Sequence, residues 1–319
     1  MSRFTDINLA LLPNPQSIQI LDYDSIVAAA IADLTQRLNN AGIAYDVGNL
    51  ETDPLKINEE HRAYFELLLR ARVNEAIRAV LLATSTGADL ENVCADLDIV
   101  RRVVTPATGN TPAVMETDEV LRARRQLAPE GFSCAGPVGA YYFFSLEAHP
   151  FVKDVGVYGP ESGLVDPGQV KVSVLSNQGN GAASDQVVAS VAAKLNAREI
   201  RPLTDQVIVE SATIVDYQIN LVITLPPGPD PTYPAAIQAQ ATARLTTLAA
   251  ALNAVGQGVP LAILYAAAAI PDATGVSPAL NIAPAFPGIS GDIVADIPDT
   301  PRTAFNCTAI TVTTDVVAP

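Results

Sequence analysis

Over the first 130 residues, apolar side chains recur every three or four positions, the spacing of amphipathic α-helices. The first helix opens at Asp22 or Asp24 as N-cap and stops at Gly42. Its inward face consists of Ile26, Ala30, Leu34 and Leu38. The same spacing, with caps and prolines as boundaries, predicts further helices at 58–84, 88–104, 117–128 and 137–149.

The helix predicted at 58–84, with Asn58 as its cap, has two adjacent apolar stripes. One contains Phe65, Leu69, Val73, Ala76 and Val80, and the other contains Tyr64, Leu67, Leu68 and Ala71. A helix that is apolar on more than one stripe needs more than one neighbour. In the next helix, Leu97 continues the apolar face. The interface candidates are therefore Phe65, Leu68, Leu69, Val73, Val80 and Leu97.

From Val152 onward the period changes to two, which predicts strands. Strands are expected at 152–159 and 169–176, followed by a helix capped by Ser184 and by two strands in succession within 206–225. In the last of these, Tyr217, Ile219, Leu221 and Ile223 point one way, and polar residues point the other way. One wet face is typical of an antiparallel or mixed sheet covered on one side by helices.

The C-terminal third begins with a proline-rich segment at 226–234, which we interpret as a stiff linker. Helices are predicted from Pro234 to about Gly256 and at 260–269, then a tail rich in Pro, Gly and Asp, then a strand at 307–314. The predicted fold class is α+β. It comprises a helical bundle region at 1–130, a mixed or antiparallel sheet with covering helices at 131–228, and a smaller α/β part at 229–319.

The composition indicates which kinds of partner this protein would bind. Only 17% of residues are charged and 5% are aromatic, which fits a protein packed against other proteins. The net charge of −15 repels phosphate, so direct nucleic-acid binding is not expected. The longest apolar run, Leu261 to Ile270, is too short to cross a bilayer, and the N-terminus has no apolar run of signal-peptide length.

Residues that usually carry chemistry are few. Cys94, Cys134 and Cys307 are widely separated, so we expect small buried side chains rather than disulfides or a zinc site. His61 and His149 have no metal-ligand spacing and are expected at the surface or at a helix end. The loop SNQGNG before Ser184 lacks the lysine of a phosphate-binding loop, so it is interpreted as a connection. No cofactor and no enzymatic activity are predicted.

One chemistry remains open, because paired carboxylates are what a glycosidase needs. The acids Glu130, Glu147, Asp154 and Glu161 cluster in sequence near the predicted change from helices to sheet. They leave a tail-associated glycan hydrolase as an alternative function. A sugar-binding module is a further alternative, weakly supported by nine tyrosines and the absence of tryptophan.

The segment RPLTD is the densest polar cluster. Arg201 and Asp205 flank a proline turn just before a predicted strand, and we interpret them as a half-buried structural pair that fixes the start of that strand. On this interpretation, Arg201→Ala lowers stability and leaves the early helices intact.

Several stretches resemble the baseplate J-like proteins of contractile phage tails and tailocins. They are the D-E-x-x-R-x-R helix in TDEVLRARRQ, the segment AGPVGAY, the strand QVKVSVLS and the strand start RPLTDQV. The resemblance extends from about Glu116 to Asp230.

This resemblance implies a structural baseplate wedge protein that joins wedges into a ring around the hub and transmits the contraction signal. Its implied partners are a second copy of itself and one I-like wedge protein in a two-to-one complex, a W-like sheath-initiator protein, and neighbouring wedges. The helices would form a core bundle shared by the three chains, and the sheets would form wing and dimerisation regions. The implied location is the tail baseplate of a virion or tailocin, assembled in the host bacterial cytoplasm.

Overall fold

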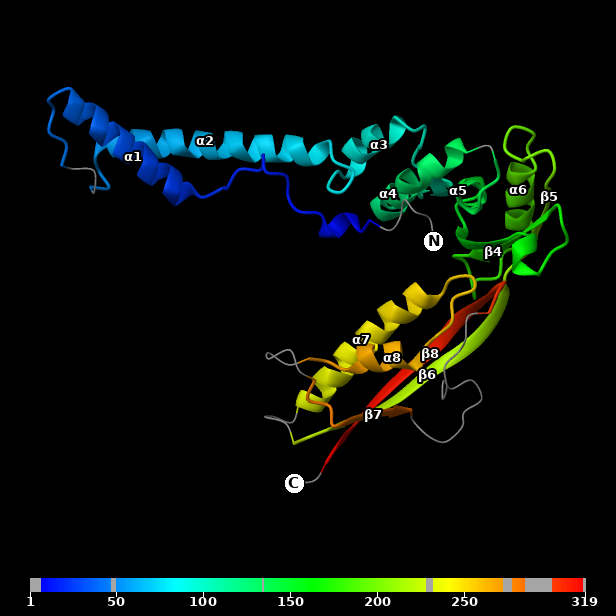
Figure 1. The fold of residues 1–319 in the computed structure, drawn as a ribbon. Helices are drawn as coiled ribbons and strands as arrows, with labels where there is room; N and C mark the ends of the chain where they lie inside the picture. Colours follow the sequence, from blue (N-terminus) through cyan, green and yellow to red (C-terminus); the bar gives the residue numbers. More distant parts are fainter. Residues whose placement is uncertain are drawn as a thin grey trace. The chain divides into compact units, whose positions relative to one another are not determined.

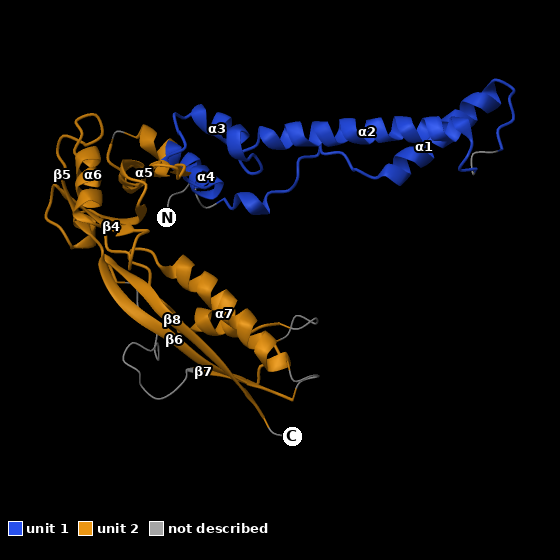
Figure 2. Cartoon of the chain, turned by 180° about the vertical axis from the view of Figure 1, so that it is seen from behind, with its two compact units in different colours: residues 1–102, 115–128 blue, residues 103–114, 129–319 orange. Residues whose placement is uncertain are grey.

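The computed structural model of the chain contains two compact units, one formed by residues 1–102 and 115–128, the other by residues 103–114 and 129–319 (Figure 2). The residues that the structure describes are 7–46, 50–133, 135–227, 232–271, 277–284 and 300–317. Within these described residues, helices alternate with three small sheets (Figure 1), which confirms the predicted α+β class. Among the described helices, none is long and apolar enough to cross a membrane.

The first unit is helical. Its elements are the 3₁₀ turn η1 (Leu9–Leu11), α1 (Tyr23–Asn40), α2 (Pro54–Ala79), α3 (Gly87–Ala95) and α4 (Asp118–Leu127). The predicted cap of α1 is confirmed, because the Asp22 carboxylate accepts the Ser25 N–H. The cap of α4 is Thr117, as expected. Next to this unit in sequence, β1 (Val103–Thr105) and β2 (Val114–Met115) form a two-stranded sheet.

Two sequence predictions in this unit are wrong. α2 begins at Pro54 with Asp53 as its cap, not at Asn58, because the Asp53 side chain accepts the Lys56 N–H and proline suits the first helical turn. The helix expected at 88–104 ends at Ala95. Asp98 takes a left-handed conformation with φ of 59°, and the Ile99 N–H bonds back to the Cys94 carbonyl. That closure turns the chain away from the helix axis.

The second unit contains two three-stranded sheets. Its remaining elements are η2 (Ala128–Phe132), α5 (Val138–Ala148), β3 (Val152–Tyr158), η3 (Pro160–Ser162), β4 (Gln169–Ser176), α6 (Asp185–Leu195), β5 (Gln206–Ser211), β6 (Thr213–Leu225), α7 (Tyr233–Leu252), α8 (Leu261–Ala268), β7 (Asn281–Pro284) and β8 (Thr303–Val316). β5 and β6 are separated by Ala212 alone, yet they belong to different sheets.

The first sheet has the order β3-β4-β5, with β3 antiparallel and β5 parallel to β4. α5 and α6 pack on it through one core that includes Tyr141, Val172, Val174 and Val191. The Ser184 side chain caps α6, as predicted. A mixed sheet covered by helices is thus confirmed for this part of the chain.

The second sheet has the order β7-β6-β8, with β7 antiparallel and β8 parallel to β6. α7 and α8 cover it (Figure 1), and the core contains Tyr217 and every second residue of β6 as far as Leu225. The predicted alternation along β6 is therefore confirmed. The predicted strand at 307–314 is also present and is longer, since β8 spans Thr303–Val316.

The three-part domain division at 130 and 228 stays a prediction. The middle of the proline-rich linker (228–231), much of the tail before Thr300, and Cys134 lie outside the described residues.

Candidate interaction surfaces

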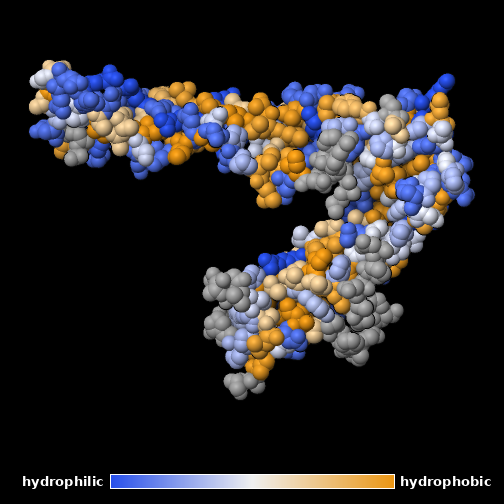
Figure 3. Space-filling view, viewed as in Figure 1, coloured by the Kyte–Doolittle hydropathy of each residue, from blue (hydrophilic) through white to orange (hydrophobic). Residues whose placement is uncertain are grey.

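The sequence-predicted interface residues of α2 lie mostly at the surface. The exposed fraction of the residue is 52% for Phe65, 67% for Leu69 and 70% for Val80, and Leu68 and Val73 are exposed as well. Phe65, Leu69, Val73 and Val80 recur at three-to-four- and seven-residue intervals, so they form one stripe about 22 Å long. Figure 3 shows apolar residues in orange along this unit.

The buried side of α2 is more polar than the exposed stripe. Its buried residues are Lys56, Glu59, Ala63 and Asn74. The Asn74 amide makes two hydrogen bonds, of 2.9 and 2.8 Å, to the main chain of Gln19 just before α1. Helices of monomeric proteins normally turn their apolar face inward. In α2 this arrangement is reversed, because the apolar stripe faces solvent and the buried side is polar. An exposed apolar stripe of this kind is typical of a surface that a partner covers.

Leu97 differs from the other interface candidates. It lies after the end of α3 and is half-buried within its own unit. Leu97 lies outside the helix because the left-handed residue Asp98 and the hydrogen bond from Ile99 to Cys94 end it. Leu97 is therefore not on a helical stripe with the residues of α2.

The arginines of α4 tie the helical unit together, a role that sequence reasoning missed. Arg122 donates hydrogen bonds of 2.7 Å to the carbonyls of Leu82 and Ser85, in the connection after α2. Arg125 binds the Asp96 carboxylate at 3.0 Å and the Val93 carbonyl at 3.3 Å, at the end of α3. The arginines thus supply donors to main-chain carbonyls in the connection between α2 and α3 and in the last turn of α3.

A second group of contacts centres on Glu116 and Asp118, at the start of α4. Arg124 and Glu116 form a buried ion pair, and Arg102 lies 3.3 Å from the same carboxylate. Arg101 binds Asp118 at 2.6 Å and Glu91 at 2.5 Å. The Gly87 N–H, and then Arg101, lower the pKa of the Asp118 carboxyl by stabilising its ionised form. The motif D-E-x-x-R-x-R therefore holds α3 against α4.

Arg201 and Asp205 lie close together before β5, and both are half-buried. The Arg201 Nη1 donates to the Asp205 main-chain carbonyl at 2.5 Å. The Asp205 carboxylate instead accepts the Tyr141 hydroxyl at 2.7 Å. Burial, and then this carboxylate, raise the pKa of Tyr141. The cluster links α5 to the start of β5, which is consistent with a structural role.

AGPVGAY belongs to the same cluster. Gly136 has φ of 75°, and a side chain there would lie 2.7 Å from Pro202 and 3.1 Å from Asp205. Only glycine fits both the conformation and the space. The motif and RPLTD therefore meet in three dimensions.

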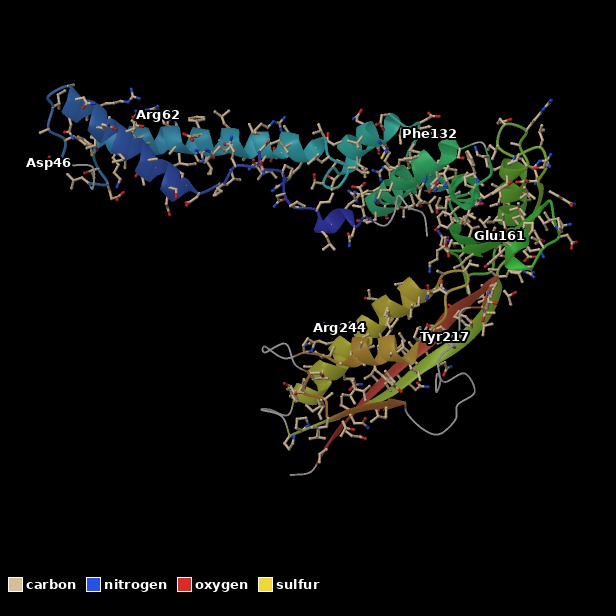
Figure 4. The ribbon with its side chains drawn as sticks, viewed as in Figure 1. Asp46, Arg62, Phe132, Glu161, Tyr217 and Arg244 are labelled. Carbon is tan, nitrogen blue, oxygen red and sulfur yellow. The ribbon has the colours of Figure 1, made fainter. Side chains whose placement is uncertain are left out.

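The acids considered for glycan hydrolysis lie on different elements. Asp154 on β3 accepts the Tyr142 hydroxyl at 2.9 Å and the Val255 N–H at 2.7 Å. Glu130 is buried in η2, where its carboxylate would lie 2.4 Å from a side chain at Gly139. Glu161 is exposed on η3 (Figure 4). Asp154 is thus occupied by structural contacts, and Glu130 is buried in its own element.

Within the described residues, the histidines and cysteines occupy positions that are typical of structural residues. His61 is exposed and its ring meets Phe65 edge-on, and His149 forms the C-cap of α5. Cys94 is fully buried, and burial raises the pKa of its thiol. Across the described residues, no cluster of His, Cys, Asp and Glu is arranged to hold a metal ion.

Known proteins match this chain over most of its length. Residues 51–108 match the Baseplate J-like N-terminal domain, and residues 133–211 match the Baseplate J-like central domain. Baseplate protein J of Escherichia phage P2 is 40% identical over 268 residues, covering 82% of this chain and 86% of that protein. By this similarity, the chain is a member of the baseplate J-like family.

Proposed function

We propose that this chain is a structural component of the baseplate wedge in a contractile tail and that it has no catalytic role. The observation that carries the proposal is the exposed apolar stripe of α2. It is supported by membership of the baseplate J-like family and by the similarity to baseplate protein J of phage P2. The place of action would be the tail baseplate of a virion or tailocin, after assembly in the host bacterium.

In this proposal, α2 packs into a helical bundle shared by two copies of the chain and one I-like wedge protein. The assembled wedge would then meet a W-like sheath-initiator protein and neighbouring wedges around the hub. Full burial of a large apolar side chain contributes about 1.5–3 kcal/mol. Phe65, Leu69, Val73 and Val80 together can therefore offset much of the entropy that association costs.

The test is co-expression with the I-like protein, followed by native mass measurement. The unmodified chain is expected to give a two-to-one complex. Leu69→Glu is expected to weaken that complex more than tenfold, because a carboxylate would be buried among apolar side chains. Arg78→Glu is the matched control, since it also adds a carboxylate but lies two and a half turns along α2, on the opposite side.

An intact complex with Leu69→Glu would contradict the assignment of the stripe. A one-to-one complex, or none with the unmodified chain, would contradict the wedge stoichiometry. Equal loss with both variants would show a general effect of charge on α2.

The proposal includes transmission of the contraction signal by rearrangement of wedge interfaces. It is motivated by the division of the chain into two compact units, which gives separate bodies for separate contacts. Cysteines introduced across the assembled wedge interface would allow it to be locked by a crosslink. Locked particles are expected to fail to contract, and normal sheath contraction would contradict this role.

A further inference from the structure

Toward its C-terminal end, β8 has one side of its main chain without a partner among the described residues. Among the described residues it pairs only with β6, so it lies at an edge of the second sheet. The Val317 N–H points toward β6, because it donates to the Leu225 carbonyl at 3.0 Å. Main-chain groups alternate sides along a strand. Those of Ile310, Val312, Thr314 and Val316 therefore face away from β6, and no described residue bonds to them.

The beginning of the same edge is closed by the chain itself. The Gly256 N–H donates to the Thr303 carbonyl at 2.8 Å, and the Asn253 side-chain amide donates to the Phe305 carbonyl at 2.8 Å. From Ile310 onward this cover ends. The open stretch is thus a defined segment of the strand.

The open edge from Ile310 onward also lacks the lysine and proline that often prevent strand pairing. Proteins protect edge strands with lysine, proline or inward charges. The sequence of β8, TAFNCTAITVTTDV, contains no lysine, arginine, proline or glycine, and its single charge is Asp315. Threonine, valine and isoleucine favour an added strand.

A cleft adjoins this edge. A cavity of about 450 Å³ lies between the flank of α7 at Thr242, Thr246 and Ala250 and the segment of β8 up to Ile310. α7 lies alongside β8 (Figure 1). A neighbouring cavity of about 280 Å³ shares Lys153, Asn253 and Asn306 with it and extends to the SNQGNG loop. Lys153 of β3 thus lies beside this loop, which contains no lysine of its own.

The cleft differs in charge from the rest of the chain. Lys153 lines both cavities, and neither lining contains Asp or Glu, although the chain carries a net charge of −15. The Lys153 ammonium donates to the Asn253 side chain at 2.6 Å and to the Ala250 carbonyl at 3.5 Å. An ammonium has three N–H donors, so one remains for a ligand. The adjacent Asp154 carboxylate is engaged by Tyr142 and Val255.

We propose that the open edge of β8 and this cleft bind an extended, acidic segment of a partner protein. The segment adds a strand next to Ile310–Val316, and one of its carboxylates binds Lys153. Main-chain pairing provides the contact along the edge, and the lysine selects for charge. This site is on a different element from the α2 stripe, so it does not depend on the proposed wedge bundle.

The probes are two acetylated peptides of about eight residues with alternating Thr and Val, one ending in Glu and one ending in Lys. Each is titrated into the full-length chain, and amide hydrogen exchange is followed. The Glu peptide is expected to bind at least about tenfold more tightly, since a charge-assisted hydrogen bond is worth that much. It is expected to slow exchange at Ile310, Val312, Thr314 and Val316.

Three variants locate the site. Thr314→Pro removes an outward N–H but keeps the pairing with β6, so it is expected to abolish binding. Thr313→Val keeps its N–H toward β6 and is expected to bind normally. Lys153→Gln is expected to remove the preference for Glu over Lys while the edge amides stay protected, and it tests the proposal even if Thr314→Pro fails to fold.

Four results would overturn the proposal. They are no binding of either peptide, equal binding of both, binding without protection of the edge amides, and edge amides that become protected with increasing protein concentration alone. The last result would assign the edge to a second copy of the chain.

Discussion

Arg124 lies on α4 with its guanidinium against the Glu116 carboxylate, and the two side chains are only 5% and 3% exposed. Arg124→Met would leave a buried carboxylate with Arg102 as its remaining cation. Removing one partner of a buried pair costs about 3–5 kcal/mol, and Arg102 should keep the loss near 3 kcal/mol. Chemical denaturation measures it. The exposed Arg72→Met serves as control, and a loss below about 1 kcal/mol for Arg124→Met would contradict the importance of the pair.

The raised pKa of Tyr141 predicts how the free energy of unfolding changes in alkaline solution. Burial and the Asp205 carboxylate raise its pKa, so the folded chain keeps the phenol proton after the unfolded chain has lost it. The resulting stability is fully present below the unfolded pKa of about 10 and is lost as pH rises above it. Each such tyrosine contributes a slope of up to about 1.4 kcal/mol per pH unit. The same direction holds for Tyr142, which burial and Asp154 affect alike.

Denaturation midpoints between pH 9 and pH 11 test this dependence. Tyr141→Phe is expected to be less stable at neutral pH, through loss of the bond to Asp205, and to show a shallower decline above pH 10. Tyr64→Phe is the control, because Tyr64 is exposed on α2. An unchanged decline for Tyr141→Phe would show that its proton is not retained on folding.

At the scale of elements, the end of α3 depends on one backbone conformation. Asp98 has φ of 59°, a region that β-branched residues occupy only with strain. Asp98→Val is therefore expected to lower the free energy of unfolding by roughly 1–2 kcal/mol. Asp98→Gly is expected to be neutral or slightly stabilising. Thermal denaturation of both variants decides the matter, and equal stability of the two would contradict it.

Sequence periodicity predicted most helices and strands but not where some of them end. The apolar spacing through Leu97 and Val100 continues past Ala95, so nothing in the pattern indicated the left-handed residue at Asp98. The start of α2 was missed because Asp53–Pro54 precedes the apolar stripes. The arginine roles were also missed, because Arg122 and Arg125 bind main-chain carbonyls, which residue types do not reveal.

Which strands pair with each other could not be predicted from the sequence either. β6 and β8 are each recognisable, but α7, α8 and β7 lie between them in the chain. Their parallel pairing is determined by packing under α7 rather than by a local turn. The apolar stripe on α2 was recognised from helical spacing, and its residues are exposed in the single chain. Its role as an interface stays a prediction.

At the scale of the whole molecule, the second unit connects its two sheets through Arg302. This residue has φ of 65°, and its N–H donates to the Tyr158 hydroxyl at 2.7 Å. Its guanidinium binds Glu210 of β5 at 2.5 Å, and Lys171 of β4 lies 3.7 Å from the same carboxylate. The two sheets therefore share one ion-pair network.

Glu210→Gln tests that network without changing its shape. The pairs are partly exposed, so the expected loss is about 1 kcal/mol, or about fivefold faster amide exchange at Arg302 and Thr213. Exchange within α7 should stay unchanged. Glu161→Gln, at an exposed acid of the same unit, is the control. If the exchange rates at Arg302 and Thr213 do not change, the network does not hold the sheets together.

The lone residue between β5 and β6 has a mechanical consequence. Ala212 is 5% exposed, and its N–H donates to the Val174 carbonyl at 2.8 Å. Tension applied to the far end of β6 would pass straight along a covalent backbone into the neighbouring sheet, because there is no slack connector to stretch first. Force applied to one sheet would therefore act on both, and the two sheets would respond to load together rather than independently.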